Sequence, residues 1–483
     1  MLFNSIEFLI FFPTVVILYF LLPYKNRWML LLAASSIFYM AFIPKFILVL
    51  IFLILVDYYA GLIIERSKGR SRKIMLIISI ICNIGILSIF KYFNFFLENI
   101  NFLISKLDFQ YALPFLSIIL PLGLSFHVFQ SMSYTIEVYR KRQKAEKNLG
   151  IYALYVLFFP QLVAGPIERP YNLLHQFRQR HNFNEALIVS GLKLMLWGFF
   201  KKVVIADRLG IFVDSIYSNP TQSSGLLLAL ATYSFAFQIY CDFSGYSDIA
   251  IGAARVMGFK LMTNFEKPYL SKSISEFWTR WHISLSSWFR DYLYIPLGGN
   301  RVNKIFWVRN ILFVFLISGF WHGADWKFVI WGGLHGFYLL LERLLNVFWK
   351  KYSFLIQIPS TIKNSTAIFI TFNLVSFSWI FFRANNIKDA WLICEKIIFS
   401  IVTGNTNLVK ANIGLSILDN DLIITFLFVF ILVTVEFIQK QRPVWELLKS
   451  KPIALRWLVY YIVLFIILFF GEFNRTKFIY FQF

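Results

Sequence analysis

The sequence is short of charge, cysteine and histidine. Only 15% of its 483 residues are charged, whereas soluble domains are about 25% charged. No pair of histidines, cysteines or carboxylates has the spacing of metal ligands, so we expect no bound metal or other cofactor. The few cysteines all lie in apolar surroundings and predict neither a disulfide framework nor a thiolate site; they are Cys82, Cys241 and Cys394.

Apolar sequence, by contrast, is abundant. The chain is 58% hydrophobic and 20% aromatic, and its mean hydropathy is +0.65. Several runs, among them 8–22, 46–64 and 421–438, approach the length of about 20 residues that crosses a hydrocarbon core. The short alternating segments of a closed β-barrel are missing. The sequence predicts an all-α polytopic membrane protein with about eleven to thirteen membrane segments, short or re-entrant helices included.

Basic residues exceed acidic ones and give a net charge of +22. In a polytopic protein, Lys and Arg hold cytoplasmic loops inside and contact anionic lipid, so we expect membrane lipid and no nucleic acid as a partner. Basic clusters at 65–73, 139–147 and 439–451 can all be cytoplasmic if both termini are extracytoplasmic. No Lys or Arg precedes the first apolar run, which we expect to be retained rather than cleaved.

The middle of the chain is less regular than its flanks. Between residues 160 and 345 the apolar runs are interrupted by "PQLVAGPIERP", "CDFSGYSD", "IPLGGN" and "GGLHG". Non-helical backbone at membrane depth is tolerated only where protein buries it or where it lines a wet cavity. We therefore expect a single membrane domain over 1–483, with N-terminal helices in 1–150, a catalytic core of broken helices in 151–345, and C-terminal helices and an extracytoplasmic tail in 346–483.

The segment 275–292, "SEFWTRWHISLSSWFRDY", has helical spacing of its aromatic residues. They form one apolar face opposite a polar stripe, and the segment is rich in Trp and Arg. The pattern predicts one helix lying in the membrane interface plane. The apolar face consists of Phe277, Trp281, Leu285, Trp288 and Tyr292, and the polar stripe of Glu276, Arg280, Ser284, Ser287 and Asp291.

Two of the six histidines are candidates for chemistry. His322 follows a long apolar run in "SGFWHGADW", and an ionisable residue near membrane depth is a functional hypothesis by default. A neutral imidazole can take a proton from a hydroxyl and return it to a leaving group. The alternative is a structural histidine bound to a backbone carbonyl. From composition, His282 is an interfacial residue on an aromatic helix.

The remaining polar signals have simpler interpretations. His335 fits close packing between helices, His127 fits a core position, and the basic loop predicts solvated His175 and His181. "DFSGYSD" is not a nucleophile elbow, and "LGGN" is too short for a phosphate-binding loop. The two aspartates of the former, Asp242 and Asp248, are predicted to be helix caps or polar lining of a cavity.

Four long motifs carry a resemblance to a known family. The chain resembles the membrane-bound O-acyltransferases, in particular their bacterial polysaccharide (alginate) O-acetyltransferase branch. The likeness covers nearly the whole chain. It rests on "FFPQLVAGPIERP" (158–170), "IYCDFSGYSDIAIGAARVMGF" (239–259), "FWTRWHISLSSWFRDYLYIPLGGNR" (277–301) and "GFWHGADWKFVIWGGLHG" (319–336).

The resemblance implies a multi-helix fold with a tunnel or funnel between the two membrane faces. The Trp-His-Gly motif carries the family's reaction histidine onto His322, and the Trp-His-x-Ser motif carries a second histidine onto His282. On this view His322 is the general base for an acceptor hydroxyl, and His282 orients or polarises the donor carbonyl. The implied donor is cytoplasmic acetyl-CoA or an acyl-carrier thioester, and the implied acceptor is an extracellular polysaccharide of a bacterium.

Other functions remain open beside this one. Teichoic-acid D-alanyl transfer and peptidoglycan O-acyl transfer are related reactions. A transporter of a polysaccharide precursor would favour internal repeats and ionisable residues spread over several spans, and the sequence has neither. A scaffold for a secretion complex would need no buried histidine.

Two further segments receive functional hypotheses. The basic loop 298–309 is predicted to face the cytoplasm, where Arg301, Lys304 and Arg309 receive an anionic donor or simply anchor the loop. The C-terminal "FIYFQF" resembles the ending of a small partner peptide of the D-alanylation machinery. The resemblance implies that Tyr480 relays the acyl group to an extracytoplasmic transferase partner, whereas the alternative is an aromatic anchor.

Overall fold

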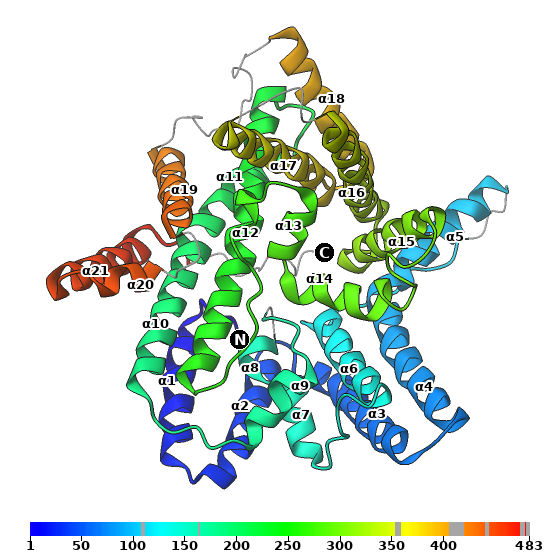
Figure 1. Ribbon diagram of the computed structural model, residues 1–483, viewed down its shortest axis with the longest axis vertical. Helices are drawn as coiled ribbons and strands as arrows, with labels where there is room; N and C mark the ends of the chain where they lie inside the picture. The colour runs from blue at the N-terminus through cyan, green and yellow to red at the C-terminus, as the bar shows by residue number, and fades with distance from the viewer. Residues whose placement is uncertain are drawn as a thin grey trace. The chain divides into compact units, whose positions relative to one another are not determined.

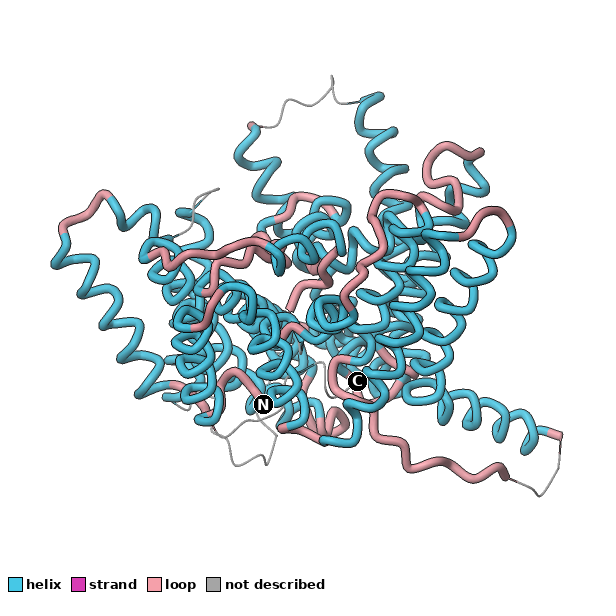
Figure 2. The backbone as a smooth tube through the Cα atoms, turned by 90° about the horizontal axis from the view of Figure 1, so that it is seen from below, coloured by secondary structure: helices cyan, strands magenta, loops and turns pink. Residues whose placement is uncertain are grey.

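The structure is a computed structural model that describes residues 1–107, 112–162, 165–352, 359–404, 420–439, 444–473 and 479. Within these residues every regular element is a helix (Figures 1 and 2), and the all-α prediction is confirmed. Eight of the described helical segments are long and apolar enough to cross a membrane, and they confirm a multi-pass membrane protein. The total of about eleven to thirteen segments, short helices included, stays a prediction. The eight are Pro44–Arg66, Arg70–Lys106, Gly225–Val256, Lys304–His322, Trp326–Val347, Ser360–Arg383, Asn420–Gln439 and Ile453–Phe470.

The chain divides into two compact units. The first contains Met1–Met195 and Tyr246–Thr263, and the second contains Leu196–Gly245 and Asn264–Phe483. The expectation of a single membrane domain with three parts stays a prediction. Two helices, α10 (Glu185–Phe199) and α12 (Gly225–Val256), have residues in both units.

The first unit is built on a membrane bundle of α3, α4 and α6, beside which α2 packs against α7 (Figure 1). Inside the bundle, the buried Asp57 carboxylate accepts hydrogen bonds from Ser79 at 2.6 Å and from Asn83 at 2.9 Å. Neutral hydrogen bonds thus satisfy a carboxylate at membrane depth. Apart from α10 and α12, the helices of this unit are α1 (Ile6–Leu21), α2 (Arg27–Met40), α3 (Ile47–Arg66), α4 (Arg70–Leu87), α5 (Phe93–Lys106), α6 (Leu124–Tyr139), α7 (Leu149–Leu157), α8 (Phe159–Leu162) and α9 (Pro170–Leu173).

The second unit holds the motifs that the sequence singled out. Its α15 packs along α16, α16 packs against α17, and the short α13 contacts both α16 and α17 (Figure 1). Apart from α10 and α12, the helices of this unit are α11 (Asp207–Tyr217), α13 (Ile274–Arg280), α14 (Ile283–Phe289), α15 (Lys304–His322), α16 (Trp326–Tyr352), α17 (Ser360–Arg383), α18 (Ile387–Thr403), α19 (Asn420–Gln439), α20 (Val444–Lys449) and α21 (Ile453–Phe470).

Glycine in this unit brings helices together more often than it breaks them. A Cβ on Gly319 would lie 2.2 Å from the Phe328 carbonyl oxygen, and one on Gly332 would lie 2.2 Å from the Phe315 carbonyl oxygen. Small residues at these positions let the backbones of α15 and α16 approach closely. "GGLHG" therefore lies inside the continuous α16, and "CDFSGYSD" lies inside the continuous α12. The predicted interruption at these two motifs is wrong, whereas "IPLGGN" does form turns between helices.

The segment 275–292 is not one helix, so that prediction is also wrong. It forms α13 and α14, which are separated at Trp281 and His282, and then a π-helical turn from Arg290 to Tyr294. His282 has left-handed backbone angles, φ 43° and ψ 53°. That conformation costs a residue with a Cβ about 1–2 kcal/mol and ends any helix. Helical periodicity continues across the break, which is why the spacing of side chains does not reveal it.

Candidate functional site

The local fold of "SGFWHGADW" places His322 at a helix end. His322 is the last residue of α15, and Gly323 follows with extended backbone angles. A Cβ on Gly323 would lie 2.1 Å from the ring of Phe328, so glycine is required there. The Asp325 carboxylate then accepts a hydrogen bond from the Lys327 amide at 2.9 Å and caps the start of α16. The motif is therefore a tight turn that ends one helix, starts the next and buries the histidine.

Aromatic rings from three helices surround His322. The ring centroids of Trp321, Trp331 and Phe382 lie 4.8, 4.9 and 5.4 Å from that of His322. Lys327 holds this arrangement, because its ammonium donates a hydrogen bond to the Ala384 carbonyl at 2.5 Å and so ties α16 to the end of α17. The carboxyl end of a helix favours positive charge. The position of His322 on α15 therefore stabilises the imidazolium that forms when a base accepts a proton.

His282 occupies the break between α13 and α14 and is 0% exposed. Its turn is stabilised by Asn264, whose backbone carbonyl accepts a hydrogen bond from the Ile283 amide at 2.9 Å. The side-chain oxygen of Asn264 lies 3.1 Å from Nδ1 of His282. Burial lowers the pKa of His282 to about 3, so the imidazole is neutral at physiological pH.

The tautomer of His282 follows from the same contacts. The Oδ1 atom of Asn264 also lies 3.3 Å from the Ser284 amide and 2.9 Å from the Ser284 hydroxyl. A backbone N–H can only donate, so the amide group of Asn264 must present its oxygen to this turn. An amide oxygen only accepts, and Nδ1 of His282 lies closer to this oxygen, at 3.1 Å, than to the Ser284 hydroxyl, at 3.5 Å. We therefore assign the hydrogen of His282 to Nδ1. Its Nε2 atom carries the lone pair.

The structure brings the two candidate histidines to the same indole. The ring centroid of Trp321 lies 4.8 Å from that of His322 and 6.4 Å from that of His282. On its other side, His282 contacts Phe243 with a centroid distance of 4.6 Å. Residues 40 positions apart in the sequence thus border one aromatic, water-poor region inside the second unit.

His335 is also buried, but its surroundings are those of a structural residue. The Trp278 indole N–H donates to its Nδ1 at 3.3 Å, so Nε2 carries the hydrogen and donates to the Ser378 hydroxyl at 2.8 Å. Both ring nitrogens are used to join α13, α16 and α17. This supports the prediction of close helix packing at His335.

The other histidines lie in the first unit. His127 is buried in α6, as expected of a core position, and His175 is exposed. His181 is half-buried: its Nε2 lies 2.9 Å from the Gln176 carbonyl and its ring centroid 4.6 Å from that of Phe259. The prediction of a solvated His181 is therefore wrong, because the loop folds back onto an aromatic side chain.

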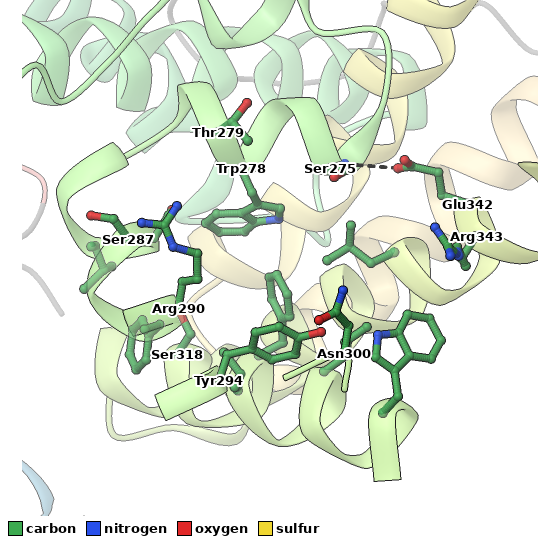
Figure 3. Close-up of a pocket in the computed structure, with 18 of the residues that line it drawn as sticks. Ser275, Trp278, Thr279, Ser287, Arg290, Tyr294, Asn300, Ser318, Glu342 and Arg343 are labelled. Atoms are coloured by element: carbon green, nitrogen blue, oxygen red, sulfur yellow. Dashed lines mark hydrogen bonds between the residues drawn. The ribbon is translucent and has the colours of Figure 1, made fainter. Parts of the chain in front are cut away.

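A pocket of about 540 Å³ opens beside the two candidate histidines, a size typical of ligand sites. Ile283, the neighbour of His282, and Ser318, one helical turn before His322, both line it. Figure 3 shows the Trp278 ring in the middle, Arg290 on one side, and Glu342 and Arg343 on the other. The pocket therefore joins an apolar interior to a charged rim.

The basic residues predicted to receive the donor do not line this pocket. Arg301, Lys304 and Arg309 are all exposed, and Arg309 donates a hydrogen bond to the Asn310 side chain at 2.9 Å. The arginines on the rim, Arg290 and Arg343, were not predicted. Arg290 lies in the turn after α14 and Arg343 lies in α16, and no sequence spacing links them.

Asp242 and Asp248 lie inside α12, so the prediction of helix caps is wrong for both, whereas polar lining of a cavity stays a prediction. The Lys202 ammonium lies 2.7 Å from carboxylates of both Asp242 and Asp207. Asp242 also accepts a hydrogen bond from the Ile479 amide at 2.7 Å. Ile479 is thus bound to the core of the unit, whereas Tyr480 lies outside the described residues.

A search of the described residues for three or more His, Cys, Asp or Glu side chains placed to hold a metal ion finds no such group. What the second unit does offer is a pocket and, near it, two buried imidazoles besides the structural His335. This set suits proton transfer and orientation of a substrate.

Comparison with known proteins agrees with the site. The profile of the membrane-bound O-acyltransferase (MBOAT) family matches residues 108–384, which include both histidines, the pocket and α12. The chain belongs to this family. The resemblance noted in the sequence is confirmed.

Curated relatives extend over most of the chain. The probable alginate O-acetylase AlgI of Pseudomonas aeruginosa is 41% identical over 82% of this chain and 74% of its own length. A peptidoglycan O-acetyltransferase of Helicobacter pylori is 38% identical over 81% of this chain and 78% of its own length. A teichoic acid D-alanyltransferase of Streptococcus thermophilus is 31% identical over 56% of this chain and 69% of its own length.

Proposed function

We propose that this protein is a membrane O-acyltransferase that moves an acetyl group from a cytoplasmic thioester donor to an extracytoplasmic, alginate-like polysaccharide. The observation that carries the proposal is the pair of buried histidines that both contact Trp321, next to a ligand-sized pocket. The names of relatives that are 41% identical over 82% of the chain support an acetyl group and an alginate acceptor. Peptidoglycan is the second candidate acceptor, supported by the Helicobacter pylori relative.

In the proposed reaction His322 is the general base. The acceptor hydroxyl gives its proton to His322 while its oxygen attacks the thioester carbonyl carbon. The new C–O bond forms, the C–S bond breaks, and the imidazolium returns the proton to the departing thiolate. Its place at the carboxyl end of α15 favours the transient positive charge. General base catalysis of this kind contributes about 10²–10⁴-fold.

The sequence suggests that His282 either orients or polarises the donor carbonyl, and we assign it the orienting role. A carbonyl is polarised by a hydrogen-bond donor, whereas the Nε2 atom of His282 carries a lone pair. We assign to Nε2 a hydrogen bond from an amide N–H of the donor's pantetheine arm, which both CoA and acyl carriers contain. That contact would hold the thioester carbon near His322.

The pocket is proposed to receive this donor arm. Its apolar wall around Trp278 suits the chain of the arm, and the rim arginines Arg290 and Arg343 suit a phosphate group. The loop 298–309 with Arg301, Lys304 and Arg309 would then face the cytoplasm as an anchor and an attractive surface for an acidic donor. Both termini would be extracytoplasmic.

Tyr480 is proposed as an acyl relay to an extracytoplasmic transferase partner. The hydrogen bond from the Ile479 amide to Asp242 binds the residue that precedes Tyr480 to the second unit. The Tyr480→Phe variant keeps the ring and removes only the nucleophile. The relay predicts loss of glycan acylation at normal protein levels, with an acyl adduct on the wild-type C-terminal peptide by mass spectrometry. Normal acylation by the variant would make Tyr480 an anchor.

The proposed function is tested most simply in the producing bacterium. Deleting the gene should remove O-acetyl esters from one class of cell-surface glycan. The wild-type gene should restore them, and the His322→Ala variant, expressed at the same level, should not. Unchanged esters on every surface glycan after deletion would contradict the proposal.

A further inference from the structure

Asn264 uses both its backbone and its side chain on a single turn. It lies between α12 and α13, 18 residues before His282, and is 0% exposed. Its carbonyl binds the Ile283 amide, and its Oδ1 faces Nδ1 of His282 and both donors of Ser284. A buried amide that serves three successive residues specifies the geometry of that turn.

The turn needs such a partner because its backbone is unfavourable. His282 has φ 43°, a left-handed conformation that a side chain with a Cβ adopts rarely. The hydrogen bonds from Ile283 and Ser284 to Asn264 hold the backbone there. The bond between Oδ1 and Nδ1 then fixes the ring in one orientation and one tautomer.

We propose that Asn264 is a positioning residue that holds His282 as the Nδ1–H tautomer, with the Nε2 lone pair directed to the substrate. The consequence for catalysis rests on the proposed function; the tautomer itself does not. No covalent bond changes at His282: Nε2 accepts a hydrogen bond from the donor arm and keeps its lone pair, and the proton transfer takes place at His322.

A neutral amide suits this task better than a carboxylate. A negatively charged carboxylate next to Nδ1–H would favour the imidazolium form. In that form Nε2 carries a hydrogen and can no longer accept a hydrogen bond. The rings around His282 belong to Phe243, Phe265 and Trp321, none of which ionises. The polar side chains that contact Nδ1, those of Asn264 and Ser284, are uncharged and favour the neutral imidazole.

The tautomer is measured directly by ¹⁵N NMR of protein labelled at histidine and held in lipid nanodiscs. The His282 signals are identified by their loss in the His282→Gln variant. We expect a protonated Nδ1 and an unprotonated Nε2 in the wild type and in Ser284→Ala, which removes a hydroxyl that lies 2.9 Å from the Asn264 oxygen and 3.5 Å from Nδ1 but leaves the Asn264 oxygen in place. Asn264→Leu should lose that state, and Asn264→Asp should keep Nδ1 protonated.

A wild-type spectrum with the hydrogen on Nε2, or an Asn264→Leu spectrum identical to wild type, would overturn the proposal. If Asn264→Leu does not fold, the wild-type and Asn264→Asp spectra decide, because a hydrogen on Nε2 alone in either contradicts the assignment. Correct folding is checked by the elution profile of each variant in detergent.

Turnover supplies the second readout. In Asn264→Leu the Nε2 lone pair of His282 is no longer held in place to accept a hydrogen bond from the donor arm, so kcat should fall about 100-fold. The kcat of Ser284→Ala should stay within a few-fold of wild type. In Asn264→Asp the carboxylate should raise the pKa of His282, so activity should be lost at a higher pH than in wild type as the pH falls. If the spectra agree with expectation but wild-type protein transfers no acyl group, the proposed function fails and the tautomer assignment stands.

Discussion

The regions around His282 and His335 contain the same residue type at the same burial and hold it in opposite tautomers. Both side chains are 0% exposed and are surrounded by aromatic rings. Asn264 accepts from Nδ1 of His282, whereas the indole of Trp278 donates to Nδ1 of His335. Burial therefore does not separate a reactive histidine from a structural one. The hydrogen-bond partner does, because it determines which nitrogen keeps a lone pair.

The use of the second nitrogen differs as well. Nε2 of His335 donates to Ser378, so this histidine joins three helices through both nitrogens. His282 instead sits in a strained turn beside a pocket and shares Trp321 with His322. Strained backbone next to a pocket is frequent at functional sites. We infer that the His335 region supports the fold and that the His282 region supports the reaction.

Between these two regions, the largest expected effect comes from removing the imidazole of His282. His282→Gln should lower kcat for acyl transfer by about 100-fold, because the donor loses its orienting contact. The measurement is turnover of a labelled acetyl thioester by purified protein in nanodiscs. Near wild-type kcat in a correctly folded variant would remove His282 from the site.

A smaller, purely structural effect is expected on the His335 side. Ser378→Ala leaves the Nε2–H of His335 without its acceptor and should lower the free energy of unfolding by about 1–3 kcal/mol. The control is Ser376→Ala in the same helix, since its buried hydroxyl has no hydrogen-bond partner among the described residues. Denaturation midpoints of the two variants in detergent provide the comparison. Equal midpoints would show that the bond to His335 adds no stability.

The pocket rim should affect donor binding rather than chemistry. Reversing the charge of Arg290 and Arg343 together should raise KM for the thioester donor about tenfold, equivalent to about 1.4 kcal/mol, and added salt should reduce the difference. Charge reversal at Arg301 and Lys304, which are exposed outside the pocket, is the matched control. A larger effect of the control pair would return the donor site to the loop 298–309.

The smallest effect concerns stability at acid pH. Burial lowers the pKa of His282 to about 3 from its ordinary 6.5. Below pH 6.5 His282 is protonated in the unfolded chain but stays neutral in the folded chain. The folded state therefore loses stability as the pH falls toward 3. Between pH 7.5 and 5.5 this amounts to about 1 kcal/mol. His282→Gln should reduce the pH dependence of stability by that amount, because the other buried histidines remain, and the exposed control His175→Gln should leave it unchanged, as followed by thermal unfolding; identical pH dependence in all three proteins would contradict the assignment.

Much of this architecture is predictable from the sequence, and the reason is the length of its signals. Hydropathy over about 20 residues identifies helices such as α3, α19 and α21 because each span must bury its own backbone. Family motifs likewise identify His322 and His282 as candidates. The apolar stretch 114–138, by contrast, is helical only from Leu124 onward, because Pro121 and the left-handed Gly123 precede it. A local exception of this kind is lost in an average over a window.

Features that depend on residues distant in the sequence were missed. The break at His282 is stabilised by Asn264, and the pocket rim combines Arg290 with Arg343. Asp242 has a helix-cap pattern but binds Lys202 and Ile479 inside the fold. Glycine is ambiguous in the same way, because "GGLHG" serves a helix contact that only the position of α15 reveals. Single-sequence patterns contain no information about such partners.

The most direct test of the account is a single assay on the histidines of both regions. Acyl transfer from a labelled acetyl thioester is measured for the purified wild type, His322→Ala, His282→Gln and His335→Gln at equal amounts of folded protein. We expect His322→Ala and His282→Gln to lose at least about 100-fold in rate. The rate of His335→Gln, per amount of folded protein, should remain within a few-fold of wild type. Substantial transfer by His322→Ala, or a His335→Gln variant as inactive as the other two, would contradict the central claim.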